Sequence, residues 1–374
     1  MQLYLHIPFC KSKCAYCDFN SYACKDEALI LRYLTALNHE ISLAGKRFAK
    51  AKIDTVYIGG GTPSALDENK ISSVFNALEN SFDLSFVKEF SIECNPESIT
   101  AEKLALYKKH GVNRISIGVQ SLSDENLKVI GRLHDANTAI EKIKLAKDFF
   151  DNISCDLIIG LPFDTIDGVR EEVRTLCPLV EHISMYELSV EKGTRLERML
   201  QNGKVTLPSD DDTQSLFDAA FDEAEKLGFQ RYEVSNFAKN DKISLHNFGY
   251  WTREEYLGLG AGAHSLVKTI DGERMLASET RYANLSKLDE YCSAVEGNED
   301  YKDIVRESVE TLTEKDVKNE TVMLGLRTHT GINKDLLGEI DDRLSVFFEE
   351  QDGKVRLTRD GVAVMNSILV EILD

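Results

Sequence analysis

The chain has 374 residues, of which 43% are hydrophobic and 29% are charged, and its formal net charge is −19. This length and composition predict a soluble globular protein with one large domain and a smaller one. So acidic a chain repels phosphate backbones, which argues against a large nucleic-acid interface. No apolar run reaches the roughly 18 residues of a membrane helix, and no basic segment followed by an apolar stretch opens the chain. We therefore expect a cytoplasmic protein without an integral membrane segment.

Strand-like and helical segments alternate through the first half of the chain. Runs rich in Val, Ile, Tyr and Phe predict six strands, at residues 3–7, 55–58, 89–93, 114–119, 155–159 and 183–188. Between them, apolar residues recur at three- and four-residue steps; in the first helix they are Ile30, Tyr33, Leu37, Ile41, Ala44 and Phe48. Six β–α repeats in order predict an α/β fold, a parallel sheet with helices outside.

Unusual residues gather where these strands end. A cysteine loop follows the first strand, a G-G-G-T-P turn at residues 59–63 follows the second, and Glu93 ends the third. Gln120 ends the fourth strand, and Asp156 lies in the fifth. Chemistry at the carboxyl ends of consecutive parallel strands is typical of a barrel mouth, whereas a doubly wound sheet binds ligands at one switch point. We therefore favour a six-stranded partial barrel, (β/α)6.

The pattern changes after about residue 200. Pro208 and the aspartates at 210–212 begin a helix that Gly228 ends, and a strand at 231–235 and a Gly-rich stretch at 258–264 follow. From about residue 307 we expect three helices, a hairpin turning at residues 352–353 and a last helix, which together suggest a small winged-helix-like α+β domain. The predicted division is a barrel at 1–205, an extension at 206–300 and the C-terminal domain at 301–374.

Three of the eight cysteines lie close together, with the spacing C-x3-C-x2-C: Cys10, Cys14 and Cys17. Neighbouring thiolates suit soft metals, above all iron–sulfur clusters. Three thiolates can hold three irons of a [4Fe–4S] cubane and leave the fourth open to the methionine end of S-adenosylmethionine (SAM). An electron from such a cluster cleaves the sulfonium to a 5′-deoxyadenosyl radical. A structural zinc site that takes Cys24 or His6 as fourth ligand is the alternative.

The cysteine motif and the G-G-G-T-P turn together resemble the radical SAM superfamily. The segment Y-x-H-I-P-F-C at residues 4–10 resembles more narrowly the relatives of the oxygen-independent coproporphyrinogen III oxidase. The resemblance covers nearly the whole chain, including D-L-I-I-G-L-P at 156–162. It implies an external electron donor and a SAM site. The SAM-site residues that it implies are Tyr4, Tyr16, Gly60, Gly61, Thr62, Glu93, Gln120, Arg132 and Asp156.

Two features depart from the oxidase pattern. Phe19 stands where the oxidase has a further cysteine, and only nine residues precede Cys10, where the oxidase has an N-terminal extension. In both respects the chain is similar to the HemW-type heme chaperones. That resemblance implies a protein that binds heme and hands it to an acceptor protein, which the sequence does not identify.

A match to H-N-x-x-Y-W at residues 246–251 supports the heme interpretation. Its candidate heme contacts are His246, Asn247, Tyr250 and Trp251. Neutral imidazole is a standard axial ligand of heme iron, and aromatic side chains can cover a porphyrin face. His6 and His264 are further ligand candidates. The structural alternative is a histidine that merely packs against its aromatic neighbours.

The predicted function is therefore that of a heme chaperone with three cofactors or cargoes: the [4Fe–4S] cluster, SAM and heme. Its expected partners are the heme acceptor and an electron donor, and a homodimer is left open. One alternative is the oxidase reaction, an oxidative decarboxylation of coproporphyrinogen III propionates that begins with hydrogen abstraction. A radical SAM methyltransferase is a second alternative, and a zinc-stabilised barrel without redox chemistry is a third.

Overall fold

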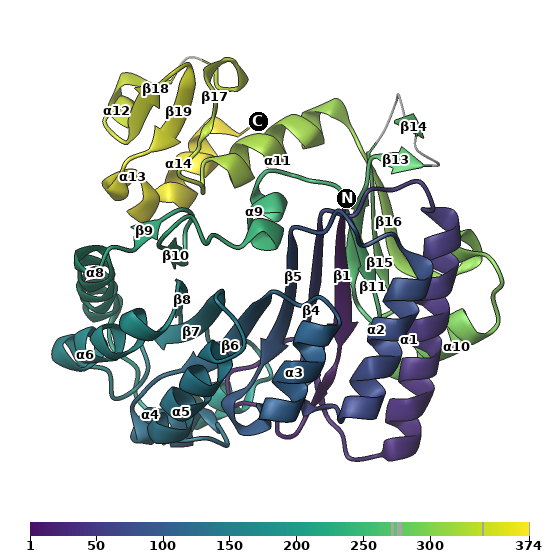
Figure 1. Cartoon of the computed structure of the whole chain (residues 1–374). Coiled ribbons are helices and arrows are strands. Elements are labelled where there is room, and N and C mark those ends of the chain that lie inside the picture. Colours follow the sequence, from purple (N-terminus) through teal and green to yellow (C-terminus); the bar gives the residue numbers. More distant parts are fainter. Residues whose placement is uncertain (271–272, 275–278, 339, 374) are drawn as a thin grey trace.

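The computed structural model describes residues 1–270, 273–274, 279–338 and 340–373. Within them, a twelve-stranded sheet has the order β16-β15-β12-β11-β1-β4-β5-β6-β7-β8-β10-β9. Its consecutive parallel strands are β11 (Tyr256–Leu259), β1 (Gln2–Ile7), β4 (Thr55–Gly60), β5 (Glu89–Cys94), β6 (Arg114–Gln120), β7 (Ile153–Ile159) and β8 (His182–Glu187). Antiparallel strands extend both edges: β9 (Gln230–Arg231), β10 (Asn236–Ala238), β12 (His264–Val267), β15 (Glu279–Asn284) and β16 (Arg306–Leu312). The sheet curves but stays open, as a partial barrel (Figure 1).

Helices cover the outer face of the curved sheet (Figure 1). Those that follow the parallel strands are α1 (Glu27–Arg47), α2 (Glu68–Ser81), α3 (Ala101–Lys109), α4 (Asp124–Ile130), α5 (Ala136–Lys147), α6 (Ile166–Leu176) and α7 (Arg195–Gln201). Helix α1 begins where the Asp26 side chain accepts hydrogen bonds from two backbone N–H groups. It buries the predicted stripe that includes Tyr33, Leu37 and Ile41. No described helix is both long enough and apolar enough to cross a membrane.

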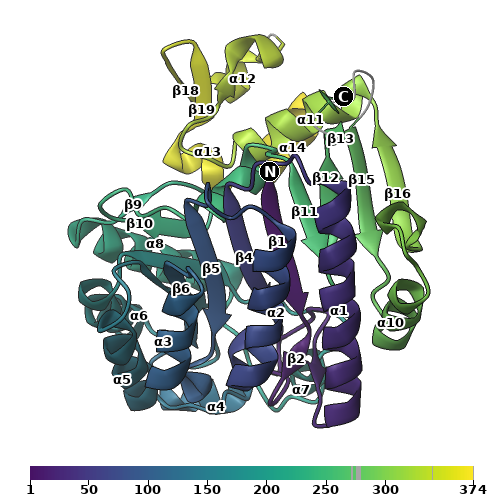
Figure 2. The same cartoon turned by 45° about the vertical axis from the view of Figure 1, so that its right-hand side comes forward.

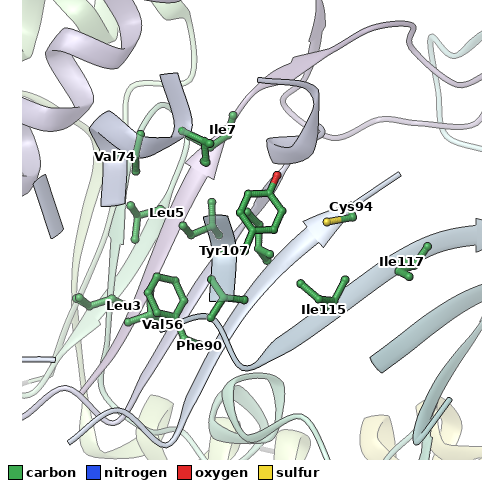
Figure 3. Packing of buried hydrophobic residues seen from close by; sticks show 14 of the residues in the cluster. Leu3, Leu5, Ile7, Val56, Val74, Phe90, Cys94, Tyr107, Ile115 and Ile117 are labelled. Atoms are coloured by element: carbon green, nitrogen blue, oxygen red, sulfur yellow. The ribbon is translucent and has the colours of Figure 1, made fainter. Parts of the chain in front are cut away.

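The strands sort their side chains by the two-residue period of a sheet. Leu3, Leu5 and Ile7 of β1 are fully buried in the core beneath the helices, where each contributes about 1.5–3 kcal/mol relative to an exposed position. Figure 3 shows them beside residues of neighbouring strands and of α2 and α3. The alternate residues Tyr4 and His6 face the inside of the barrel, where both line a cavity. The outer face therefore holds the core, and the inner face is free for polar residues.

The six predicted parallel strands are confirmed, and β11 adds a seventh beside β1 within the described chain. The strand predicted at 231–235 is wrong, because the chain turns between β9 and β10. The Arg231 guanidinium holds this turn by donating to the backbone oxygens of Glu233 (3.1 Å) and Val234 (2.6 Å). The helix predicted from about residue 307 is wrong at its start. There, β16 pairs with β15, a long-range contact that local periodicity does not reveal.

The segments after the barrel contain the remaining elements. Those before residue 300 are α8 (Asp210–Lys226), α9 (Leu245–Trp251), the short strands β13 (Thr269–Ile270) and β14 (Glu273–Arg274), and α10 (Leu288–Glu296). Helix α11 (Glu314–Gly325) then leads into β17 (Ile332–Asn333), α12 (Asp342–Ser345), β18 (Phe348–Gln351), β19 (Lys354–Leu357), α13 (Arg359–Ala363) and α14 (Met365–Ile372).

The last of these segments has a core of its own, separate from the barrel core, which includes Val322, Val355 and Ile368. The predicted hairpin is confirmed: β18 and β19 pair around Asp352 and Gly353, whose φ angles are 53° and 75°. Two consecutive left-handed residues are what a two-residue hairpin turn requires. This segment lies at the end of the barrel where the parallel strands begin, opposite the cysteine loop (Figures 1 and 2).

Candidate functional site

A small cavity of about 120 Å³ lies where the parallel strands end. It is lined by every predicted cluster and SAM residue except Tyr4: Cys10, Cys14, Tyr16, Cys17, Gly60, Gly61, Thr62, Glu93, Gln120, Arg132 and Asp156. These residues meet because parallel strands deliver their carboxyl ends to one edge. Asn95, Ser116 and Gly118 also line the cavity, although the sequence did not predict them as site residues. Side chains alternate between the two faces of a strand, so Ser116 and Gly118 lie on the same face of β6 as Gln120. This alternation could have identified these two residues from the sequence.

Each of the three cysteine sulfurs has a polar neighbour. The Thr62 hydroxyl donates to Cys10 Sγ (3.5 Å), Arg132 Nη1 donates to Cys14 Sγ (3.5 Å), and Cys17 Sγ lies 3.6 Å from Ser21 Oγ. Donors aimed at sulfur stabilise a thiolate and tune a bound cluster.

The arrangement of the thiols bears on the zinc alternative. Among the described residues, no group of three or more His, Cys, Asp or Glu side chains is placed to hold one metal ion. The three thiolates of a cubane bind separate irons and need not converge on one point. Three thiols beside donors from Thr62 and Arg132 are a donor set that suits an iron–sulfur cluster, whereas a structural zinc ion needs a fourth ligand at the same centre.

The glycine turn after β4 brings bare backbone close to the cysteine loop. A Cβ atom on Gly61 would lie 2.9 Å from the Phe9 carbonyl oxygen and 3.0 Å from Cys10 Sγ, so a side chain here would clash. Gly60 has a φ of 117°, which disfavours any side chain. Its N–H donates to Glu93 Oε2 (2.9 Å) and so ties the turn to the end of β5.

Arg132 spans the small cavity and has one buried donor to spare. Its Nη2 donates to Asn95 Oδ1 (2.7 Å) and to the Gly118 carbonyl oxygen (2.5 Å). Its Nε is buried and has no hydrogen-bond partner within the described chain. Because buried donors are normally paired, this nitrogen suits an acceptor oxygen of a ligand. Gln120 beside it has a left-handed φ of 72°, at a register shift in β6, and such strain is common at binding sites.

Two carboxyl groups of the small cavity hold their protons unusually well. Burial raises the pKa of Glu93 to about 7, although hydrogen bonds from the Tyr57 hydroxyl (2.8 Å) and from Gly60 act against the shift. Burial likewise raises the pKa of Asp156 to about 6. Desolvation disfavours the charged form of a carboxyl group, and a bound cation would reverse that effect. The pair therefore suits a positively charged ligand.

A larger cavity of about 690 Å³ adjoins the small one on the inner side of the barrel. Phe19, Gly60 and Glu93 line both cavities. The predicted residues that line the larger cavity are Tyr4, His6, Asn247, Tyr250, Trp251 and His264. Further lining residues, which the sequence did not predict, come from β8, the turn between β9 and β10, β10, β15 and α11; among them are Tyr186, Glu233, Asn236, Arg281 and Glu320.

Comparisons with known proteins agree with this geometry. A family model described as the radical SAM superfamily matches residues 4–176. The heme chaperone HemW of Bacillus subtilis (strain 168) is 35% identical over 90% of this chain and 86% of its own length. The HemW family of radical SAM proteins includes this chain. The mitochondrial radical S-adenosyl methionine domain-containing protein 1 of Bos taurus is 31% identical over 99% of this chain and 87% of its own.

A solved structure supports the fold of this HemW-family chain. Coproporphyrinogen III oxidase (HemN) from Escherichia coli, described as a radical SAM enzyme, superposes with a TM-score of 0.80. The match covers 99% of this chain and 89% of the oxidase, at 21% identity, and it shows a shared fold. Membership of the radical SAM superfamily implies a [4Fe–4S] cluster and SAM. Which residues hold them stays a prediction.

His246, the first residue of the HemW-type H-N-x-x-Y-W segment, lies in helix α9 and is fully buried. Its Nδ1 and the Thr55 hydroxyl oxygen lie 2.8 Å apart, and its Nε2 lies 2.9 Å from the Tyr250 hydroxyl oxygen. Burial lowers the pKa of His246 to about 3, so the ring is neutral. His246 is not among the described residues that line the larger cavity, whereas Asn247, Tyr250 and Trp251 are.

The two other candidate histidines of this HemW-family chain do line the larger cavity, but they differ in their hydrogen bonds. The ring nitrogens of His6 lie 3.0 Å from the Tyr4 hydroxyl oxygen and 2.8 Å from the Asn20 carbonyl oxygen. His264, the first residue of β12, is exposed. Its ring takes part in none of the hydrogen bonds found between described residues.

Proposed function

We propose that this chain is a heme chaperone. It holds a [4Fe–4S] cluster on Cys10, Cys14 and Cys17, SAM in the small cavity and heme in the larger one, and it passes the heme to an acceptor protein. The observation that carries the proposal is that the small cavity adjoins a second cavity of about 690 Å³, within the size range of ligand sites. The relatives named as HemW heme chaperones support it.

In the small cavity, the chain's part is to orient the methionine end of SAM. When bound, the cluster supplies the electron that cleaves the sulfonium. The spare Nε of Arg132 suits the SAM carboxylate. The bare backbone of Gly60 and Gly61 lets the ligand approach the cysteine loop. Glu93 and Asp156, protonated more readily than usual without ligand, accept hydrogen bonds from cationic or hydroxyl groups of SAM.

In the larger cavity, we assign His264 as the iron ligand. Its ring is exposed at the cavity wall and needs to give up no described hydrogen bond. Because iron takes one ring nitrogen, His246 would have to give up Tyr250 or Thr55, and leaving that partner unpaired in a buried site costs about 1–3 kcal/mol. The part of His246 is then to hold Tyr250 in the cavity wall. Tyr250 and Trp251 supply aromatic surface for a porphyrin face.

An anaerobic hemin titration of the reconstituted protein tests the proposal. We expect wild type to take up one heme, with the absorption and electron paramagnetic resonance (EPR) spectra of a histidine ligand. His264→Ala should lose that spectral signature, whereas His246→Ala should keep it, as should the control His39→Ala at a half-buried position outside the cavity. Loss of the signature in His246→Ala alone would overturn the ligand assignment. No stoichiometric uptake by wild type would overturn the chaperone itself.

An activity assay separates the chaperone from the two enzyme alternatives. The reconstituted protein is incubated anaerobically with coproporphyrinogen III, SAM and a reductant. The chaperone proposal expects the porphyrinogen to remain unchanged. Protoporphyrinogen as product would establish the oxidase reaction. A methylated product together with S-adenosylhomocysteine would establish a methyltransferase.

A further inference from the structure

A groove outside both cavities is rich in positive charge. It is lined by Glu125, Lys128 and Val129 of α4, by Phe163, and by Arg195, Arg198, Met199, Asn202 and Lys204 of α7 and the turn after it. Its volume is about 750 Å³. None of these described residues lines the cavity proposed for heme or the one proposed for SAM. We call this feature the basic groove.

The basic groove is positively charged, whereas the chain as a whole is strongly negative. Lys128, Arg195, Arg198 and Lys204 are exposed cations, and Glu125 is the one carboxylate among the described lining residues, although the whole chain carries −19. No ion pair within the described chain involves any of the four cations; Arg198 Nε donates only to the Thr194 carbonyl oxygen (3.3 Å). Unpaired cations grouped on an acidic protein create a local positive field that attracts acidic partners.

Both walls of the basic groove are fastened to the cysteine loop. The backbone N–H of Ala15 donates to the Ile130 carbonyl oxygen at the end of α4 (2.7 Å). The N–H of Leu196 at the start of α7 donates to the Ala15 carbonyl oxygen (2.8 Å). Ala15 directly follows Cys14 and packs with Ile130 and Leu196 in one small apolar cluster. Figure 2 shows α4 and α7 at the end of the barrel where β2 (Phe9–Cys10) lies. A protein seated in the groove would therefore contact two helices that are hydrogen-bonded directly to the cysteine loop.

We propose that the basic groove is the docking surface for a small acidic one-electron carrier protein that reduces the cluster. The inference rests on the proposed function, because that function places the cluster on the cysteine loop. In the step, a reduced flavin or iron–sulfur carrier loses one electron, and the cluster goes from the 2+ to the 1+ state. No bond forms or breaks and no proton moves.

The side chains that line the basic groove also suit a small electron carrier. Phe163 is 51% exposed and, with Met199, gives the groove an apolar centre within a charged rim, which is how transient interfaces are commonly built. Electron-transfer partners bury little surface and dissociate quickly. A heme acceptor would instead need access to the larger cavity, which the groove residues do not line.

The first test measures binding of an oxidised acidic flavodoxin by titration calorimetry at low ionic strength. The groove variant is Arg198→Glu with Lys204→Glu, two exposed side chains that do not contact the cysteine loop. The control, Lys109→Glu with Lys354→Glu, makes the same charge change at exposed positions elsewhere. We expect binding about tenfold weaker in the groove variant and unchanged in the control. Equal affinities in all three proteins would overturn the proposal, and so would equal losses in both variants.

The second test follows cluster bleaching by stopped flow with reduced flavodoxin, and with dithionite as a small reductant. Flavodoxin should reduce the groove variant about tenfold more slowly, with a weaker salt dependence, and dithionite should reduce both alike. A groove variant that flavodoxin reduces as fast as wild type would overturn the proposal. If dithionite bleaches nothing in wild type, the cluster assignment fails, and the calorimetric comparison still decides whether the groove binds the carrier.

Discussion

The two adjoining cavities draw their walls from the chain in different ways. The small cavity is built from the cysteine loop and the ends of β4 to β7 and the turns beside them, so its residues follow one another along the chain in a regular order. The walls of the larger cavity include residues of β1, β8, β10, α9, β12, β15 and α11. These elements span more than three quarters of the sequence. The difference teaches that a repeated unit shows from the local pattern where its strands end, whereas long-range packing brings a cavity wall together from segments whose local pattern does not place them side by side.

The largest effect should come from the cysteines and should be confined to the small cavity. Replacing Cys10, Cys14 and Cys17 by Ser removes the thiolates and should abolish cluster iron and labile sulfide, measured by chemical analysis after anaerobic reconstitution. Cys24→Ser, at a half-buried position outside the cavity, is the matched control and should keep the wild-type iron content. Iron retained without the three thiols would contradict the assignment of the cluster to the cysteine loop.

Arg132→Met should weaken the binding of SAM in the small cavity without weakening the binding of heme in the larger one. The change removes the donors to Asn95, Gly118 and Cys14 and the spare Nε. Because a charge-assisted hydrogen bond contributes about 1.5–3 kcal/mol, SAM should bind at least about tenfold more weakly. Hemin affinity should stay within about twofold, since Arg132 does not line the larger cavity. Equal losses for the two ligands in calorimetry would mean that the cavities act as one site.

Glu93 and Glu320 should make contributions to the free energy of unfolding that depend on pH in opposite directions. The folded-state pKa of Glu93, about 7, lies above its unfolded value, so its contribution to stability is complete at low pH and is lost as pH rises through 7. Between pH 8 and pH 5 the free energy of unfolding of the metal-free chain should therefore rise by about 1–3 kcal/mol more in wild type than in Glu93→Gln. The comparison of the two proteins cancels the other groups that titrate in this range, such as Glu172 and His246. Chemical denaturation should show a flatter profile for Glu93→Gln.

Glu320, in the wall of the larger cavity, is the contrasting case. Burial acts to raise its pKa, but Arg281 and Arg253 together lower it below the usual value. Its stabilising effect is thus present at neutral pH and is lost only in acid. Glu320→Gln should leave the slope between pH 5 and pH 8 as in wild type. A slope flattened as much in Glu320→Gln as in Glu93→Gln would contradict the part assigned to Glu93.

The smallest effect is expected from Tyr250→Phe in the larger cavity. The change leaves His246 Nε2 buried without its partner and should lower the free energy of unfolding by about 1–2 kcal/mol. The spectrum of bound heme should not change if His264 is the ligand. Tyr256→Phe, from the same cavity wall, removes a hydroxyl that interacts with Arg281 and not with His246, and it is the control that should leave the heme spectrum unchanged. A shifted Soret band in Tyr250→Phe would instead link iron to His246.

The sequence predicted the six barrel strands from a repeated strand–helix pattern. The cysteine spacing marked the candidate cluster ligands, and the resemblance to the radical SAM superfamily implied the other predicted residues of the small cavity. The sequence did not predict β16 or the turn between β9 and β10, because distant strand pairing and the contacts of Arg231 decide them. The sequence revealed the H-N-x-x-Y-W segment, but it did not reveal that both ring nitrogens of His246 lie within hydrogen-bond distance of Thr55 and Tyr250 in a buried position. Burial of a ring depends on segments nearly two hundred residues away. Such contacts leave no local pattern.

The EPR spectrum of the dithionite-reduced protein, recorded with and without SAM, tests the central claim most directly. A cluster held by three thiolates has one iron free to bind the methionine end of SAM, so its g values should shift when SAM is added. An intact cluster signal that is identical with and without SAM would contradict the claim.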